Sequence, residues 1–184
     1  METHVGDDAI FLDTIQGLRR GDFSRLEPLF QSGVDASGIR SRIVEWHEEG
    51  RFRNQPEALA EALTCACFLG RKAVAEYLLA QGVDPSEGAG TGLDALHWAA
   101  NRGQLATVRL LVRHDAPLET RSMYGGTVLG TAVWSAINEP RPDHIQIIEE
   151  LLAAGARVEE VDLPTGNSCV DELLRRHGSP NPGL

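Results

Sequence analysis

The chain has 184 residues, of which 42% are hydrophobic and 24% are charged, which is enough for one domain with a hydrophobic core and too short for two ordinary domains. The formal net charge is −10 at pH 7, and this acidic balance argues against sequence-independent binding to nucleic acid or to an anionic membrane surface, since both need a basic field. It favours solubility and a basic partner.

A pair of helices is expected at the N-terminus. Asp7 or Asp8 can cap a first helix that runs to Arg20, and a second helix over 23–31 stops at Gly33. The residues of their apolar faces are Ile10, Phe11, Thr14, Ile15 and Leu18 in the first helix and Phe23, Leu26, Leu29 and Phe30 in the second. The outer face of the first helix is polar, with Asp13, Gln16, Arg19 and Arg20.

The segment 36–55 has a different pattern. It predicts a short helix that Ser37 caps and that ends at Gly50. The residues that would share its apolar face are Ile39, Ile43 and Trp46 or His47. Because an exposed tryptophan and two isoleucines need cover, we expect this insert to fold back on the rest of the chain. The alternative is that it forms part of a partner-binding surface.

Two further helix pairs follow. Pro56 opens a helix over 57–69, and 72–81 is its partner helix. In the next pair, the shared faces are Leu96, Ala99 and Ala100, and then Leu105, Val108, Leu111 and Val112. The glycine-rich turn between the pairs lacks the lysine and the preceding strand of a phosphate loop. Helices this short are not stable alone, so they must pack against neighbours.

The C-terminal part repeats this pattern with changes. A fourth pair is expected within 125–158, and extra residues with two prolines, near 137–143, separate its helices. A single helix over 169–177 with a polar outer face would close the array. The segment 179–184 is expected to be a disordered tail.

The spacing of these pairs indicates an internal repeat. Gly70 and Gly103 lie between paired helices, and Gly82 and Asp115 end the second helices of the same two pairs. The two intervals are equal, and both match a repeat period of about 33 residues. The segment 96–100 reads Leu-His-Trp-Ala-Ala, and 125–129 reads Gly-Gly-Thr-Val-Leu. From about residue 8 to residue 178 the chain therefore resembles the ankyrin repeat family, whose pattern contains T-P-L-H-x-A at this period.

The resemblance implies an all-α solenoid of about four helix pairs with a C-terminal half-repeat cap. Its expected parts are repeats at about 8–35, 56–84, 92–119 and 125–158, a cap at 162–178, and a helical insert, 36–55, in an inter-repeat finger. Together they would form a single domain, 1–178.

No catalytic or metal-binding constellation is evident. Asp94 and His97 could form an acid–base pair, but the family uses this histidine to tie the turn of one repeat to the next, and Asp94 would replace the usual threonine as the N-cap. The segment 47–49 is not the H-E-x-x-H motif of a zinc peptidase. We therefore expect no catalytic residues, no metal and no cofactor.

Cysteine usage and the termini indicate a compartment. The spacing of Cys65 and Cys67 places them on different sides of a helix, and together with Cys169 they are expected to be small buried thiols in a reducing cytoplasm. The acidic N-terminus does not fit a signal peptide, and the longest apolar stretch, 58–70, is interrupted by Glu61, so no membrane span is expected.

In ankyrin-like repeats, the residues before the inter-helix glycine and around the G-x-T-P-L turn line a concave groove. Carried over position by position, these are Arg19, Arg20, Phe68, Leu69, Leu93, Asn101, Arg102, Met123, Tyr124, Gly126, Trp134 and Ser135. Trp134, Tyr124 and Met123 beside Arg102 have the composition of an interface centre. The alternative for Trp134 is that it packs against its own insertion loop.

Two classes of function follow. The leading one is a non-enzymatic protein–protein interaction module that binds a partner protein on its rigid concave groove, as a scaffold, an inhibitor or an immunity-type protein. The alternative is a small-molecule-binding or enzymatic protein with a pocket between the 36–55 insert and the groove. Its lining would be Trp46, His47, Glu48 and Phe68. We expect a cytoplasmic monomer whose partner is a basic protein, with no binding to nucleic acid or membrane.

Overall fold

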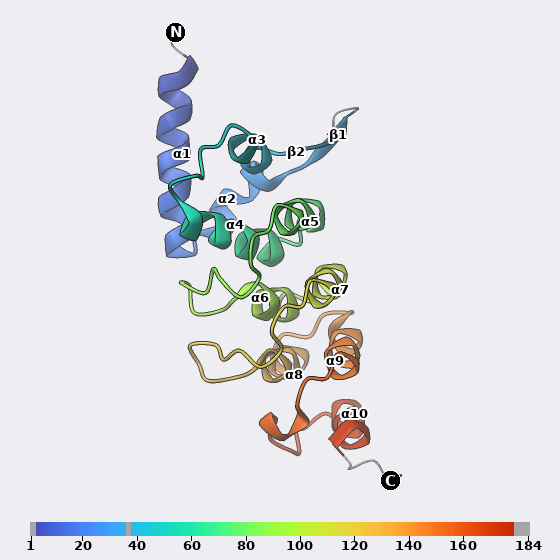
Figure 1. The fold of residues 1–184 in the computed structure, drawn as a ribbon. Coiled ribbons are helices and arrows are strands. Elements are labelled where there is room, and N and C mark those ends of the chain that lie inside the picture. Colours follow the sequence, from blue (N-terminus) through green and yellow to red (C-terminus); the bar gives the residue numbers. More distant parts are fainter. Residues whose placement is uncertain (1–2, 36–37, 179–184) are drawn as a thin grey trace.

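The computed structural model describes residues 3–35 and 38–178 and shows helix pairs stacked in chain order (Figure 1). The four pairs are α1 (Thr3–Arg20) with α2 (Phe23–Phe30), α4 (Pro56–Phe68) with α5 (Lys72–Ala80), α6 (Ala95–Asn101) with α7 (Leu105–Arg113), and α8 (Val128–Asn138) with α9 (His144–Ala153). A short 3-10 helix, η1 (Val158–Glu160), and α10 (Ser168–Gly178) follow. The predicted all-α solenoid of four pairs with a C-terminal half-repeat is confirmed.

The insert contributes three more elements between the first two pairs. These are the strands β1 (Gly33–Asp35) and β2 (Gly38–Arg40) and the helix α3 (Arg42–Glu48). The strands form an antiparallel hairpin in which Val34 pairs with Ile39. They were not expected from the sequence, although valine and isoleucine are residue types that favour an extended backbone.

Two columns of helices run through the stack. Successive helices pack against each other in an inner column of α1, α4, α6 and α8 and in an outer column of α2, α3, α5, α7, α9 and α10. Helix α1 lies at the N-terminal end of the molecule with its axis along the direction of the stack, whereas α6 to α9 are seen nearly end-on (Figure 1). The insert helix α3 therefore takes a place in the outer column between α2 and α5.

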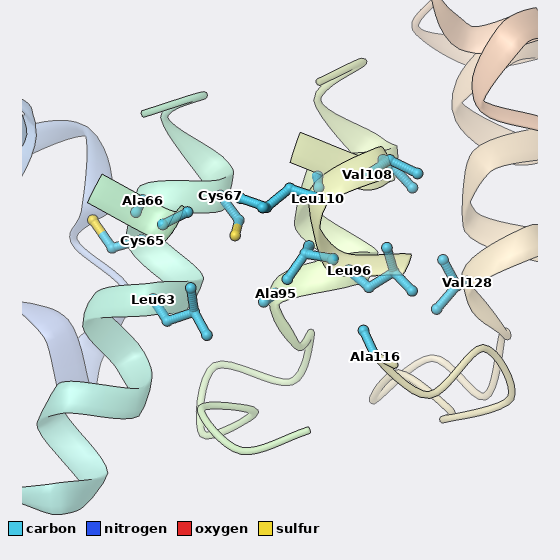
Figure 2. Packing of buried hydrophobic residues seen from close by; sticks show 14 of the residues in the cluster. Leu63, Cys65, Ala66, Cys67, Ala95, Leu96, Val108, Leu110, Ala116 and Val128 are labelled. Carbon is cyan, nitrogen blue, oxygen red and sulfur yellow. The ribbon is translucent and has the colours of Figure 1, made fainter. Parts of the chain in front are cut away.

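Small side chains let the inner helices approach closely. Ala66 and Cys67 of α4 and Ala95 of α6 are fully buried, as are Leu63 and Leu96, and Figure 2 shows Cys67 and Leu63 on the side of α4 toward α6. Each fully buried leucine contributes roughly 1.5–3 kcal/mol relative to an exposed one. Burial against the neighbouring pair thus stabilises helices that are too short to form alone.

Glycines at equivalent positions form the turns between paired helices. Gly70 and Gly103 both have left-handed backbones, with φ of +66° and +69°. A Cβ atom at Gly70 would lie 2.4 Å from Oε1 of Gln104, the residue that follows the equivalent glycine one repeat later. The left-handed turn therefore favours glycine, and a larger residue would also displace the end of the Gln104 side chain.

The insert begins its helix later than predicted. Helix α3 starts after Ser41, whose Oγ accepts a hydrogen bond from the Val44 amide at 3.3 Å. Ile39 lies in β2 and not on a helix face, so the helix predicted across Ile39 and Ile43 was wrong in its first part. The predicted cap, Ser37, lies outside the described residues.

The insert folds back on the first helix, as its apolar residues required. The rings of Trp46 and Phe52 each meet Phe11 edge-on, with centroids 5.2 Å apart. Trp46 and Phe52 are buried, and Trp46 Nε1 donates a hydrogen bond to Asp7 at 3.1 Å. Arg51 also pairs with Asp7, and its guanidinium lies 4.4 Å from the Phe11 ring centroid.

Three expectations for individual residues were wrong. Asp7 and Asp8 do not cap α1, which begins at Thr3, because arginines of the insert pair with both carboxylates inside the helix. Ile10 is 51% exposed, because the insert covers the side of α1 that carries Phe11. Cys169 is exposed in the first turn of α10, whereas Cys65 and Cys67 are buried.

No helix in the described ranges is long and apolar enough to cross a membrane.

Candidate functional site

A hollow of about 1290 Å³ lies on the inner column. Loops before α6 and α8, here called the first finger (82–94) and the second finger (115–127), project from this side, away from α5, α7 and α9 (Figure 1). The hollow is lined by α4, α6 and α8, by both fingers and by the segment after η1. Its predicted lining residues are Phe68, Leu93, Asn101, Arg102, Tyr124, Gly126 and Trp134.

The floor of the hollow contains a contiguous set of aromatic rings. Phe68 and Trp98 meet edge-on with centroids 5.0 Å apart, and the ring of Phe23 contacts both, at 5.6 Å from Phe68 and 6.3 Å from Trp98. Trp98 Nε1 donates a long hydrogen bond of 3.5 Å to Thr91 Oγ1 in the first finger. Edge-to-face contacts of this kind hold the rings in fixed positions, so the floor is formed before any ligand arrives.

Arg102 lies on this floor. Its Cζ atom is 4.6 Å from the centroid of the Phe68 ring, within the range of a cation–π interaction. The Nε atom of Arg102 is buried and has no hydrogen-bond partner among the described residues. The neighbouring Asn101 differs, since its Nδ2 donates to Ser135 Oγ of α8 at 3.0 Å. Arg102 is therefore a positioned cation with unused hydrogen-bond donors.

The rim carries large exposed side chains. Tyr124 on the second finger is 81% exposed, and Trp134 and Ile137 on α8 are 52% and 37% exposed. Trp134 thus leaves about half of its surface open to solvent. Covering these side chains with another molecule would remove apolar surface from water.

Some predicted groove residues lie elsewhere. Arg19 donates to Gln55 Oε1 at 2.9 Å, and Arg20 is exposed at the end of α1. Leu69 packs partly buried against the core, and Ser135 is fully buried. Because the axis of α1 lies along the stack and not parallel to those of α6 and α8, its last residues do not continue the groove (Figure 1).

Met123 is not among the residues that line the hollow, and it connects the two fingers. Its amide donates to the carbonyl of Gly92 at 2.7 Å, which joins the second finger to the first. Gly92 has φ of +88°, and a Cβ atom there would lie 2.3 Å from the Met123 sulfur. Met123 therefore covers Gly92 and ties the two fingers together at the edge of the hollow.

Several lining residues were missed. Trp98 lies one helical turn before Arg102, so helical periodicity alone could have placed it on the same face. Ile137, Asn138 and Glu139 reach the rim because α8 has 11 residues, against 7 in α6. The signal was the longer spacing in the fourth repeat. The contribution of Val161, Asp162, Pro164 and Thr165 had no local signal.

Asp94 and His97 form a buried structural link. Asp94 Oδ1 accepts from the His97 amide at 2.9 Å and lies 2.9 Å from His97 Nδ1, while Thr120 Oγ1 donates to Asp94 Oδ2 at 2.6 Å. Burial alone would raise the pKa of Asp94, but the hydrogen bonds from His97 and Thr120 hold it below its ordinary value. His97 Nε2 lies 3.3 Å from the Gly126 carbonyl, so the link ties α6 to the second finger.

The residues of the alternative pocket lie in separate environments. Trp46 is fully buried on Phe11, and His47 Nδ1 lies 2.9 Å from Tyr77 Oη on α5. Glu48 is exposed, and Phe68 belongs to the floor of the hollow. The structure does not bring these side chains together, because the indole of Trp46 is used to cover α1. Within 3–35 and 38–178, no group of three or more His, Cys, Asp or Glu could hold a metal ion.

Comparison with known proteins agrees with this architecture. A model of ankyrin repeats in three copies matches residues 63–162, more than half of the chain. The chain belongs to the ankyrin repeat family. The match begins within α4 and extends past η1, so it includes both fingers and most of the hollow. A search of curated proteins found no match. Ankyrin repeats generally mediate protein–protein interaction, and the family is generally non-enzymatic.

Proposed function

We propose that this ankyrin repeat protein binds a partner protein in the hollow between its fingers and helices α6 and α8, and that it does so without catalysing a reaction. The observation that carries the proposal is the exposure of Tyr124 and Trp134 on the rim of a preformed aromatic floor. Large aromatic side chains near the centre of an interface supply much of its binding free energy.

The exposed area of the two aromatic side chains can be converted into an approximate binding free energy. A tyrosine or tryptophan buries about 150–250 Å² when fully covered, so the open parts of Tyr124 and Trp134 represent roughly 200 Å² or more in total. At about 25 cal/mol per Å² this corresponds to ~5 kcal/mol. That amount offsets much of the cost of association but does not exceed it, so a partner must also use the rest of the hollow.

Rigidity and charge support a protein partner. Because each repeat is fixed by its neighbours, the groove loses little conformational entropy on binding. The net charge of −10 favours fast association with a basic partner. Scaffold, inhibitor and immunity-type roles all use such a surface. Free cysteines, two of them buried, favour a reducing compartment such as the cytoplasm.

The proposal is tested by affinity purification from the native host with matched variants. The groove variant combines Trp134→Ala, Tyr124→Ala and Arg102→Ala. The control combines Ile10→Ala and Leu12→Ala, which remove exposed apolar side chains from α1, outside the hollow. We expect a partner that binds the parent and the control equally and binds the groove variant at least about 30-fold more weakly, as for loss of an interface centre.

Circular dichroism and thermal unfolding should show that all three proteins are folded, because the substituted side chains are exposed or half-buried. A partner that binds the groove variant as tightly as the parent would contradict the proposal.

A further inference from the structure

Arg102 differs from every other half-buried arginine in the described chain. The others, Arg42, Arg51 and Arg71, each form ion pairs with an aspartate or a glutamate. The guanidinium of Arg102 has no hydrogen bond or ion pair to a described residue, and its contact is with the face of Phe68. A guanidinium that is partly removed from water and has no carboxylate partner can form two charge-assisted hydrogen bonds to a carboxylate of a bound molecule.

The opposite part of the hollow is acidic. Glu139, directly after α8, and Asp162, after η1, are exposed lining residues. Within the described ranges, neither carboxylate has a basic partner, whereas Glu119 and Glu150 pair with arginines. The hollow therefore has a positioned cation directly after α6 and carboxylates directly after α8 and in the segment after η1.

Apolar groups line the same hollow. Trp98 and Trp134 belong to α6 and α8, Tyr124 to the second finger, and Val161 and Pro164 to the segment after η1. A volume of about 1290 Å³ exceeds the usual range of roughly 300–1,000 Å³ for a small-molecule pocket. The hollow also crosses successive repeats, which suits an extended chain better than a single small molecule.

We infer that the hollow takes an extended segment of a partner protein in which apolar residues are flanked by an acidic side chain, which pairs with Arg102, and a basic side chain, which pairs with Glu139 and Asp162. This inference rests on the proposed function. It assigns Arg102 as the residue that sets the direction of the segment, because only one orientation places both charges against their complements.

The test uses a phage-displayed library of random peptides selected on the immobilised full chain. We expect enriched peptides to carry an acidic and a basic residue on opposite sides of an apolar core. Synthetic copies of these peptides should bind Arg102→Glu at least about tenfold more weakly than the parent, since the variant places like charges together. Replacing the acidic residue of the peptide by lysine should restore binding to Arg102→Glu. The same peptides should bind a protein with Glu139→Lys and Asp162→Lys more weakly.

The matched control is Arg113→Glu, which makes the same change in net charge at an exposed position on α7, outside the hollow. It should leave peptide affinity within about twofold of the parent at physiological salt.

Two other outcomes separate the inference from the proposed function. Peptides that lose binding to a Trp134→Ala, Tyr124→Ala variant, but have no acidic residue in common and bind Arg102→Glu normally, would overturn the charge pattern and leave the groove assignment intact. Selection that yields no peptide dependent on Trp134 and Tyr124 would overturn both.

Discussion

Glu61 is a carboxyl group that the fold has removed from water. It lies on α4 and is 5% exposed, and its Oε1 atom accepts a hydrogen bond from the Gly90 amide of the first finger at 2.8 Å. Its Oε2 atom is buried and has no partner in the described chain. Burial raises the pKa of Glu61 to about 7, against the lowering effect of the Gly90 hydrogen bond. The native state therefore holds this proton more tightly than the unfolded chain does.

Linkage fixes the direction of the resulting pH dependence. A carboxyl with a raised native pKa contributes stability at low pH, and that contribution is lost as pH rises from about 4.5 through about 7. We expect Glu61→Gln to be more stable than the parent at pH 8 by roughly 1–3 kcal/mol and nearly equal to it at pH 4. Urea unfolding of both proteins across this range measures the difference.

The difference between the two proteins isolates Glu61 from other groups that titrate in the same range. Burial lowers the pKa of His144, so the stability that the neutral imidazole contributes is lost as pH falls below the ordinary pKa of histidine. This effect is present in both proteins and cancels in the difference between them. A stability difference that is the same at pH 4 and at pH 8 would show that Glu61 is not protonated preferentially in the native state.

At the scale of the element, local patterns predicted the helices and missed what the insert does. Helices 57–69 and 72–81 were placed within one residue of α4 and α5 because proline, glycine and apolar periodicity mark their ends. The insert is held by Asp7 and Phe11 of α1, which lie far from Trp46 in the sequence. Such long-range contacts leave no periodic signal, so the hairpin and the true start of α3 could not be read from the segment.

The contact between insert and first helix predicts a local change on substitution. Trp46→Ala removes the packing on Phe11 and the hydrogen bond to Asp7, and we expect a loss of about 3–5 kcal/mol in unfolding free energy. Native-state hydrogen exchange should accelerate in α1 and α3 while α6 and α7 change little.

Trp134→Ala is the matched control for this substitution, since it deletes the same side chain at a position that is 52% exposed. Its cost should stay below about 1.5 kcal/mol. Equal costs for the two substitutions, or unchanged exchange in α1, would mean that the insert does not stabilise the first helix.

At the scale of the whole molecule, the repeat period predicted the stack, and the stack placed much of the hollow. Residues at fixed positions of successive repeats, such as Phe68, Asn101 and Trp134, face the same side because each repeat adds nearly the same rotation. The course of α1 and the segment after η1 could not be predicted in this way. Both lie at ends of the array, where the chain departs from the repeat and no periodic rule applies.

In a solenoid of this kind, a destabilising substitution near one end should mainly destabilise the helices at that end. Leu174 of α10 is fully buried, and α10 packs on α9 and η1 but has no extensive contact with the central pairs. We expect Leu174→Ala to cost about 2–5 kcal/mol for local opening of α9 and α10. Hydrogen exchange in α4 to α7 should be almost unaffected, since repeats stabilise only their neighbours.

Leu163→Ala is the control, because Leu163 is 43% exposed in the same part of the chain. Uniform acceleration of exchange across all helices in Leu174→Ala would indicate that the domain unfolds as one cooperative unit instead.

The hydrogen bond from Met123 to Gly92 has a consequence for how recognition can change. Gly92 does not line the hollow, yet a side chain at this position would push the sulfur of Met123 aside, and Tyr124 is the next residue along the chain. Replacing Gly92 would therefore shift Tyr124 and change the shape of the hollow that a partner segment contacts. A substitution of Gly92, whose side chain is a single hydrogen atom, can thus change which partner segment binds best. The residues that line the hollow would stay the same.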